Sequence, residues 1–328
     1  MEAFEKAASA ILSASRIVIS THMNPDGDAL GSMLALTHAL RTLGKEVTPL
    51  NVDGVPEILK WLPGAELVET LTERRDFDLG IVVDAGALDR IGKPLLPIFE
   101  AVPLLMDIDH HVTEGLVFGQ LQVLDQTAAA TAELIYELIL NLEIQSQSTL
   151  VTPEIASCLM VGLMTDTGSF RYSNVTPKVF SLASELQEEG AEVAKIAEAV
   201  YENVSFASLK LLGKALDSLQ RSEDGRVVWA SVSAQDFAEF GGTDAETEGI
   251  VSQVRAVSGA EIGMLFREIP GRKVRVSIRA RQGANANAIA KVFDGGGHIL
   301  ASGCSLEMPL QEAVDAVVTE AIRQIALS

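Results

Sequence analysis

The chain has 328 residues, enough for two ordinary domains or one large one, and its 48% hydrophobic share can fill a core. The formal net charge of -20 argues against tight binding of long nucleic acid, which needs many cationic contacts to phosphates. This charge is still compatible with a short anionic ligand held by metals and a few arginines.

The two cysteines and the N-terminal residues bear on the cellular compartment. Cys158 and Cys304 lack a paired spacing, which predicts buried thiols in a reducing compartment. Residues 1–10 contain Glu2 and Glu5 but no basic stretch, so they do not resemble a secretory signal. No uncharged apolar run reaches the roughly 18 residues of a membrane span. We expect a soluble, cytoplasmic protein.

The first half of the chain alternates helical segments with short, continuously apolar strands. Continuous apolar strands separated by helices are typical of a parallel sheet that is buried on both faces. In chain order we expect a helix at 2–14, a strand at 16–20, a helix at 29–43, and strands at 47–52, 78–84 and 103–108.

The second half begins with helices and then turns to alternating strands. We expect helices at 127–142 and 153–164, a charged helical region at 176–220, strands at 227–232, 261–269 and 273–280, and helices at 286–293 and 310–326. These elements predict an α/β fold with three parts, a parallel-sheet domain at 1–190, a helical linker at 191–215 and a smaller α/β domain at 216–328.

Polar side chains follow several of the predicted strands. Ligands of open α/β sheets bind beyond the carboxyl ends of the strands, so residues far apart in sequence can meet there. Imidazole and carboxylate together suit a divalent first-row metal such as Mn²⁺. The residues placed this way are His22, Asp26, Asp28, Asp84, His110 and His111.

The segment His22-Met23-Asn24-Pro25-Asp26-Gly27-Asp28 is the strongest local signal. Its proline and glycine suit a tight turn that would direct His22, Asp26 and Asp28 inward. The alternative is an Asp-rich turn in which Asp28 caps the following helix.

Asp84 follows an apolar strand, where a carboxylate either caps the next turn or bridges two metals. Asp107 lies within the strand at 103–108, and Asp109 is expected to orient the following imidazole. His110 and His111 are expected to point to different sides, one to a metal and one to the substrate. The alternative is a pair of surface histidines.

Asp166 ends an apolar helix, where the helix dipole disfavours an unpaired acid and a metal would offset that penalty. A structural turn carboxylate is the alternative.

The second half also has a basic segment. Residues 250–300 contain eight Lys or Arg and three acidic residues, a local balance of +5. Four alternating polar residues would share one strand face: Arg275, Ser277, Arg279 and Arg281. Gly295-Gly296-Gly297-His298 could bring backbone N–H groups close to a phosphate. The alternatives are a solvated strand face and a helix-capping loop.

Taken in order, these motifs resemble the DHH phosphoesterase superfamily. The resemblance rests on residues 22–32, on Val83-Asp84, on Asp109-His110-His111 and on Asp166-Thr167-Gly168-Ser169-Phe170. Residues 274–279 with the Gly-Gly-Gly-His segment resemble the associated DHHA1 domain. Length and lobe form are most similar to the oligoribonuclease (nanoRNase) and phosphoadenosine-phosphate phosphatase group. One departure is Ala87, where the second motif often has a further acid.

The resemblance implies a site with two Mn²⁺ ions, with Mg²⁺ or Co²⁺ as alternatives. It assigns His22 and Asp26 to one ion, Asp28, His110 and Asp166 to the other, and Asp84 to a bridge. His111 would contact the scissile phosphate. Across a cleft, Arg279, Gly296, Gly297 and His298 would hold the far end of the nucleotide.

The implied activity is hydrolysis of short substrates to 5′-mononucleotides. These substrates are nanoRNA, linear or cyclic dinucleotides and 3′-phosphoadenosine 5′-phosphate. The implied partners are short nucleotides, with no long duplex and no membrane, and a homodimer is compatible. The alternatives are a family II-like inorganic pyrophosphatase, a long-strand exonuclease of the RecJ type, and a nucleotide-binding sensor without activity.

Overall fold

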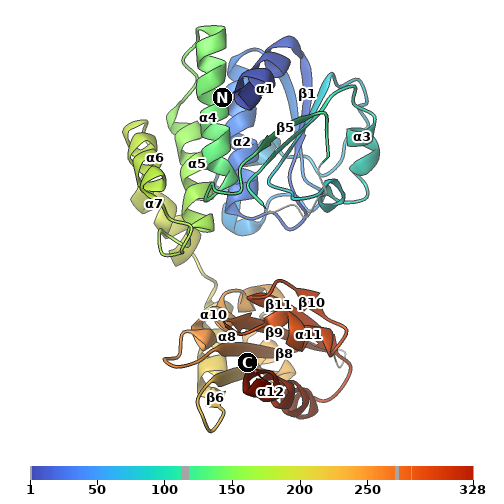
Figure 1. The fold of residues 1–328 in the computed structure, drawn as a ribbon, viewed down its shortest axis with the longest axis vertical. Coiled ribbons are helices and arrows are strands. Elements are labelled where there is room, and N and C mark those ends of the chain that lie inside the picture. Colours follow the sequence, from blue (N-terminus) through green and yellow to red (C-terminus); the bar gives the residue numbers. More distant parts are fainter. Residues whose placement is uncertain (1, 112–117, 270–272, 282, 328) are drawn as a thin grey trace. The chain divides into compact units, whose positions relative to one another are not determined.

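The computed structural model describes residues 2–111, 118–269, 273–281 and 283–327. The chain divides into two compact units, Met1–Asn203 and Val204–Ser328 (Figure 1). Each unit has its own sheet and its own hydrophobic core. The boundaries expected near residues 190 and 216 remain a prediction.

The first unit is built on a five-stranded sheet in the order β2-β1-β3-β4-β5, and every neighbouring pair is parallel. β3 and β4 are buried along their whole length, as expected for central strands covered on both faces. The predicted parallel-sheet α/β architecture is confirmed. The strands are β1 (Arg16–Ser20), β2 (Glu46–Leu50), β3 (Leu79–Val83), β4 (Leu105–Asp109) and β5 (Leu121–Leu124).

Helices cover both faces of this sheet (Figure 1). One core lies between the sheet and α1, α2, α4 and α5, and a smaller core lies on the face next to α3. The helices of the first unit are α1 (Glu2–Ser13), α2 (Gly27–Thr42), α3 (Leu96–Glu100), α4 (Thr131–Ser146), α5 (Pro153–Asp166), α6 (Pro177–Glu188) and α7 (Val193–Ala197). Short 3₁₀ segments are η1 (Glu57–Leu59), η2 (Ala65–Leu67) and η3 (Leu88–Ile91), and η4 (Glu198–Glu202) is a π-helical turn.

Glycines allow α2 and α5 to approach closely. A Cβ at Gly31 of α2 would lie 2.3 Å from the Cys158 carbonyl oxygen, and a Cβ at Gly162 of α5 would lie 2.5 Å from Asp28 Oδ1. Because both helices carry glycine at the contact, their backbones meet without intervening side chains. This packing brings the start of α2 next to the end of α5.

The second unit contains a mixed six-stranded sheet in the order β10-β11-β9-β8-β7-β6. α11 and α12 pack on one face, and α8, α9 and α10 pack on the other. The strands are β6 (Gln220–Arg221), β7 (Val227–Val232), β8 (Ile262–Ile269), β9 (Lys273–Ala280), β10 (Gly296–Gly297) and β11 (Ala301–Leu306). The helices are α8 (Phe206–Asp217), α9 (Ala234–Phe240), η5 (Asp244–Thr247), α10 (Ile250–Arg255), α11 (Ala286–Lys291) and α12 (Leu310–Leu327).

Several elements differ from the sequence-based expectation, among them the short helices α3, α9 and α10, which were not expected. β5 and β11 were not expected, and the glycines expected in a loop form β10, which pairs with β11. β9 ends at Ala280, so Arg281 lies beyond the strand face shared by Arg275, Ser277 and Arg279. Within the described residues, no helix is both long and apolar enough to cross a bilayer.

Candidate metal centre

The loop after β1 carries the first histidine of the site. His22 is buried, and its Nδ1 lies 2.8 Å from the Met23 carbonyl oxygen. A carbonyl can only accept, so we assign the proton to Nδ1, which leaves the lone pair on Nε2. His22 Nε2 lies 3.7 Å from Asp84 Oδ2 and 3.9 Å from Asp26 Oδ1. The ring therefore directs a lone pair at two carboxylates.

Asp26 caps the helix that follows. Its Oδ1 accepts hydrogen bonds from the backbone N–H groups of Asp28 and Ala29, at 3.1 and 3.0 Å. The expectation that Asp28 could be the cap is wrong, because α2 begins at Gly27 and Asp28 lies in its first turn. Capping and facing His22 are compatible, since Asp26 does both.

Asp28 is fully buried and is held by the N-terminus of α4. Its Oδ2 accepts from Thr131 N at 2.6 Å, and its Oδ1 accepts from Ala132 N at 2.9 Å and from Ser32 Oγ at 3.2 Å. Burial, and then the nearby Asp166 carboxylate, raises the pKa of Asp28 to about 8. The carboxylate is thus fixed in place but needs positive charge nearby to stay ionised.

Asp84 lies at the centre of the site. Its backbone is left-handed, with φ of 57°, which is strained for a residue with a Cβ, and its side chain is buried. Oδ1 accepts a hydrogen bond from Thr131 Oγ1 at 2.8 Å, and Oδ2 faces His22. Burial and the Asp28 carboxylate raise the pKa of Asp84 well above its ordinary value.

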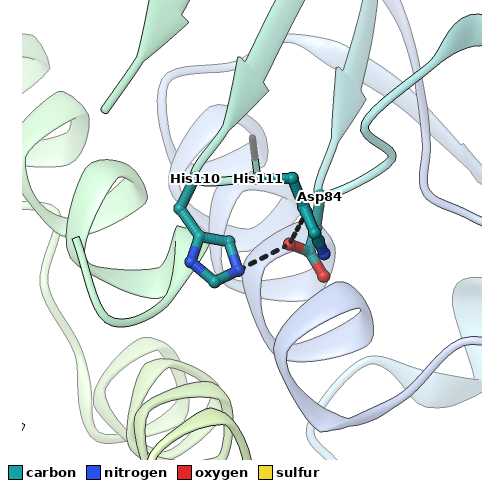
Figure 2. Close-up of side chains that lie close together, drawn as sticks. All are labelled: Asp84, His110 and His111. Carbon is teal, nitrogen blue, oxygen red and sulfur yellow. Dashed lines mark ion pairs between the residues drawn. The ribbon is translucent and has the colours of Figure 1, made fainter. Parts of the chain in front are cut away.

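His110 and His111 follow β4, and Figure 2 marks the ion pair that each forms with Asp84. His110 Nε2 and His111 Nδ1 both lie 3.5 Å from Asp84 Oδ1, and the two ring centroids are 4.7 Å apart. The expectation that these histidines point to different sides is wrong. Both lie beyond the last residue of the strand, so the alternation of side chains along a strand no longer applies to them.

The Nδ1 atoms of the two histidines have different partners. His110 Nδ1 lies 3.2 Å from the Ala128 carbonyl oxygen, which directs its Nε2 lone pair inward. His111 Nδ1 lies 2.7 Å from Asp109 Oδ1. Burial alone would raise the pKa of Asp109, but hydrogen bonds from His111 and Gly86 keep that pKa below its ordinary value. Asp109 is therefore ionised and fixes the proton of His111 on Nδ1.

Asp166 is the last residue of α5, as the sequence predicted, and its side chain is partly exposed. Its Oδ2 lies 3.1 Å from His110 Nε2, which in turn lies 3.9 Å from Asp28 Oδ2. Asp166 therefore belongs to the part of the site built by Asp28 and His110.

The donor set suits divalent cations. The described residues contain three groups whose ligand atoms lie within 4.8 Å of one another: His22 with Asp26 and Asp84, Asp28 with His110 and Asp166, and Asp84 with His110 and His111. His110 Nε2 is buried and has no hydrogen-bond partner among the described residues, although three carboxylates surround it. A lone pair that faces acceptors needs a cation between them, so these residues fit metal ions.

The predicted substrate residues lie in the second unit. Arg279 of β9 is half-buried, and His298 is exposed in the turn between β10 and β11. Gly297 has φ of 134°, and a Cβ there would lie 2.6 Å from the Ala301 carbonyl oxygen, so glycine is required. Because β11 runs between β9 and β10, Arg279 and the two glycines lie on different strands of one sheet.

Two cavities lie beside this sheet. The larger, about 720 Å³, is lined by Arg267, Arg275 and Ser277, and the smaller, about 250 Å³, is lined by Arg267, Ser277 and Arg279. The predicted Gly296, Gly297 and His298 line neither of these two cavities. Arg275 and Arg279 thus border the cavities, and of the glycine segment only Gly295 lines one of them, the larger.

Thr131 was missed by the sequence analysis. Its hydroxyl contacts Asp84 and its backbone N–H contacts Asp28. It stands in the run Ala128-Ala129-Ala130-Thr131-Ala132, where one hydroxyl at a helix start is an ordinary feature. Its one distinguishing feature in the sequence is that it is the only polar residue between Thr127 and Glu133.

Family comparisons agree with this arrangement. Residues 16–163 match the DHH family, N-terminal domain, and residues 208–327 match the DHHA1 domain. A Thermus thermophilus protein named bifunctional oligoribonuclease and PAP phosphatase NrnA is 34% identical, covering 94% of this chain and 89% of that protein. A Bacillus subtilis protein of the same name is 31% identical, covering 88% and 89%.

A solved structure has the same fold along almost the whole chain. This exopolyphosphatase-related protein from Bacteroides fragilis is 27% identical, with a TM-score of 0.90 and coverage of 99% of this chain and 97% of that one. Both domain matches follow the order in which the two units occur in the sequence. The chain therefore belongs to the DHH family and carries a DHHA1 domain in its second half.

Proposed function

We propose that this enzyme of the phosphoesterase class uses two divalent ions, Mn²⁺ in the first instance, to hydrolyse short oligonucleotides and 3′-phosphoadenosine 5′-phosphate to 5′-mononucleotides. The observation that carries the proposal is the double contact of Asp84, whose Oδ2 faces His22 while its Oδ1 faces His110. One carboxylate with its two oxygens directed at two groups of donors suits a bridge between two cations.

The ligand assignment follows from the distances. His22 and Asp26 would hold one ion with Asp84 Oδ2, and Asp28, His110 and Asp166 would hold the other with Asp84 Oδ1. His111 is left outside this set, because the ring nitrogen that lies near Asp84 is Nδ1, and the proton on this nitrogen is directed at Asp109. Imidazole and carboxylate donors together favour Mn²⁺, with Mg²⁺ or Co²⁺ as alternatives.

The bound ions would supply Lewis-acid polarisation of the phosphate and would lower the pKa of the attacking water. The protein groups orient the other partners. Asp109 fixes the His111 ring, so that the ring can contact the reacting phosphate, and Thr131 fixes Asp84. Hydrolysis adds water at phosphorus, breaks the P–O3′ bond and leaves the proton on the 3′ oxygen.

The second unit is proposed to select short substrates. Arg267, Arg275 and Arg279 present guanidinium groups beside the two cavities, and guanidinium binds phosphate with paired hydrogen bonds. Gly296, Gly297 and His298 would hold the far end of the nucleotide. The NrnA relatives, named as oligoribonucleases and phosphoadenosine-phosphate phosphatases, support this substrate class.

A substrate panel tests the proposal. The protein would be incubated with Mn²⁺ and, in parallel, with the dinucleotide pApA, a cyclic dinucleotide, 3′-phosphoadenosine 5′-phosphate, pyrophosphate and a long single strand, and the products separated by chromatography. We expect 5′-AMP from pApA and from the phosphoadenosine phosphate, and none from either in Asp84→Ala. Turnover of pyrophosphate alone, or preference for the long strand, would overturn the proposal.

A further inference from the structure

Arg90 occupies a position between two loops of the metal centre. It lies in η3, the short segment that follows Asp84. Its backbone carbonyl accepts a hydrogen bond from Met23 N at 2.7 Å, and its backbone N–H donates to Ala87 O at 3.1 Å. The backbone of Arg90 is thus fixed to the loop that carries His22, whatever its side chain does.

The side chain of Arg90 stands beside His111. Gly86 has φ of 70°, and a Cβ built there would lie 3.3 Å from Arg90 Nη1 and 3.8 Å from His111 Cβ. Atoms of the Arg90 guanidinium and of His111 therefore both lie within 4 Å of the position that a Cβ of residue 86 would take. The glycine leaves room for both.

In the described part of the chain, no group neutralises this guanidinium. Among the described residues, its side chain makes no hydrogen bond and no ion pair, and it is exposed. Arg16 in the same unit pairs with Asp76 and Asp78, and Arg75 donates to backbone carbonyl oxygens. Arg90 differs because its donors are free, although the acidic centre lies next to it.

The neighbourhood defines the ligand. Asp109 is committed to His111 and Gly86, and Asp84 is committed to Thr131 and the histidines, so their oxygens do not engage Arg90. A guanidinium presents five N–H donors in a planar fork that matches phosphate. Beside the His111 ring, which Asp109 holds through Nδ1, this fork supplies the donors of a phosphate site.

We propose that Arg90 binds a phosphate oxygen of the nucleotide, together with His111, on the first unit. This inference rests on the proposed function for the identity of the ligand. It assigns phosphate binding in the first unit to a side chain that carries no metal, in addition to the arginines of the second unit. Arg90 contacts the substrate, so its removal weakens binding of the anion and leaves the metal donors unchanged.

The test measures binding without turnover. Titration calorimetry with AMP and with inorganic phosphate, both at saturating Mn²⁺, would compare wild type, Arg90→Gln, Arg90→Lys and Arg75→Gln. A separate titration would measure Mn²⁺ affinity in each. Arg75→Gln is the matched control, an exposed arginine of the same unit outside the site.

We expect Arg90→Gln to weaken AMP binding about 10- to 100-fold, as for loss of a charge-assisted hydrogen bond. Arg90→Lys should fall between it and wild type, and Mn²⁺ affinity should not change. Equal AMP binding in Arg90→Gln and wild type would overturn the inference. So would a parallel loss of Mn²⁺, which would mean that Arg90 acts on the fold, or a wild type that binds neither anion. A wild type that binds AMP but hydrolyses no substrate would overturn the proposed function and leave this inference standing.

Discussion

Thr131 Oγ1 donates a hydrogen bond of 2.8 Å to Asp84 Oδ1, while the backbone N–H of Thr131 donates one of 2.6 Å to Asp28 Oδ2. A single residue at the first position of α4 therefore holds two carboxylates, one from the first turn of α2 and one from the end of β3. Both contacts are fully buried, so water cannot replace either. The position of these carboxylates depends on where α4 begins.

Replacing Thr131 by Val should separate the two contacts. Valine keeps the shape of the threonine side chain, and the backbone N–H of residue 131 still binds Asp28. Asp84 loses the hydroxyl that donates to it. Loss of a group that orients a ligand typically costs about 10- to 100-fold in metal affinity or activity. Mn²⁺ titration and hydrolysis of pApA would measure it. Thr131→Ser, which restores the hydroxyl, should behave like wild type, and a Thr131→Val enzyme as active as wild type would contradict the prediction.

Two glycine substitutions should change the free energy of unfolding in opposite directions. Gly31→Ala places a Cβ 2.3 Å from the Cys158 carbonyl oxygen, so α2 must move away from α5. We expect a loss of about 1–3 kcal/mol in the free energy of unfolding, from overpacking. Gly213→Ala in α8 meets nothing within 4 Å and should gain about 0.5–1 kcal/mol from helix propensity. Urea unfolding would measure both, and a stabilised Gly31→Ala would refute the close helix contact.

The metal-free protein should become less stable as pH rises. Asp28 has a folded-state pKa of about 8 against an ordinary value of 3.8, because burial and Asp166 disfavour its charge. Burial lowers the pKa of His110, but the Asp166 and Asp28 carboxylates outweigh this effect and raise that pKa to about 9. Both groups bind protons more tightly when folded, so their stabilisation is present at low pH and is lost as pH rises toward 9.

Mn²⁺ would replace those protons. Its increase of the melting temperature should therefore be larger near about pH 9 than near about pH 6. Thermal unfolding with chelator and with Mn²⁺ at the two pH values tests this. An equal increase at both would contradict it.

Asp107 should be dispensable for stability. It is fully buried in β4, neither of its oxygens has a hydrogen-bond partner in the described ranges of the chain, and burial raises its pKa to about 8. Asp107→Val should raise the free energy of unfolding by about 1–3 kcal/mol, because an unsatisfied polar group is removed and Val favours strands. The gain should grow from about pH 5 to about pH 9, since the raised pKa costs wild type stability as pH rises. Urea unfolding at both pH values would show it, and a destabilised variant would indicate a role for this carboxyl.

The sequence could indicate which side chains lie together because parallel strands impose a simple rule. The strands at 16–20, 78–84 and 103–108 are mostly apolar, which indicates burial in a parallel sheet, and their carboxyl ends meet at one edge. His22, Asp84 and His110 follow those ends and do converge. Asp166 joins them because glycines in α2 and α5 bring the two helices together.

The remaining features depend on contacts that leave no local pattern. β5 has only one buried residue, Val123, and β11 is rich in small residues, so neither has the signature of a strand. Thr131 owes its position to the residue at which α4 begins. Arg90 owes its position to the space that Gly86 leaves. The direction of His111 depends on a turn after β4, where strand alternation no longer applies.

All six donors of the metal centre belong to the first unit, whereas the cavities bordered by arginines belong to the second. Under the proposed function, the machinery that cleaves the phosphate and the surface that chooses the molecule are encoded in separate stretches of the gene. Mutations in the second stretch can then change the substrate preference of the enzyme while the cleavage reaction stays the same. Substrate preference and catalytic chemistry can therefore evolve at different rates.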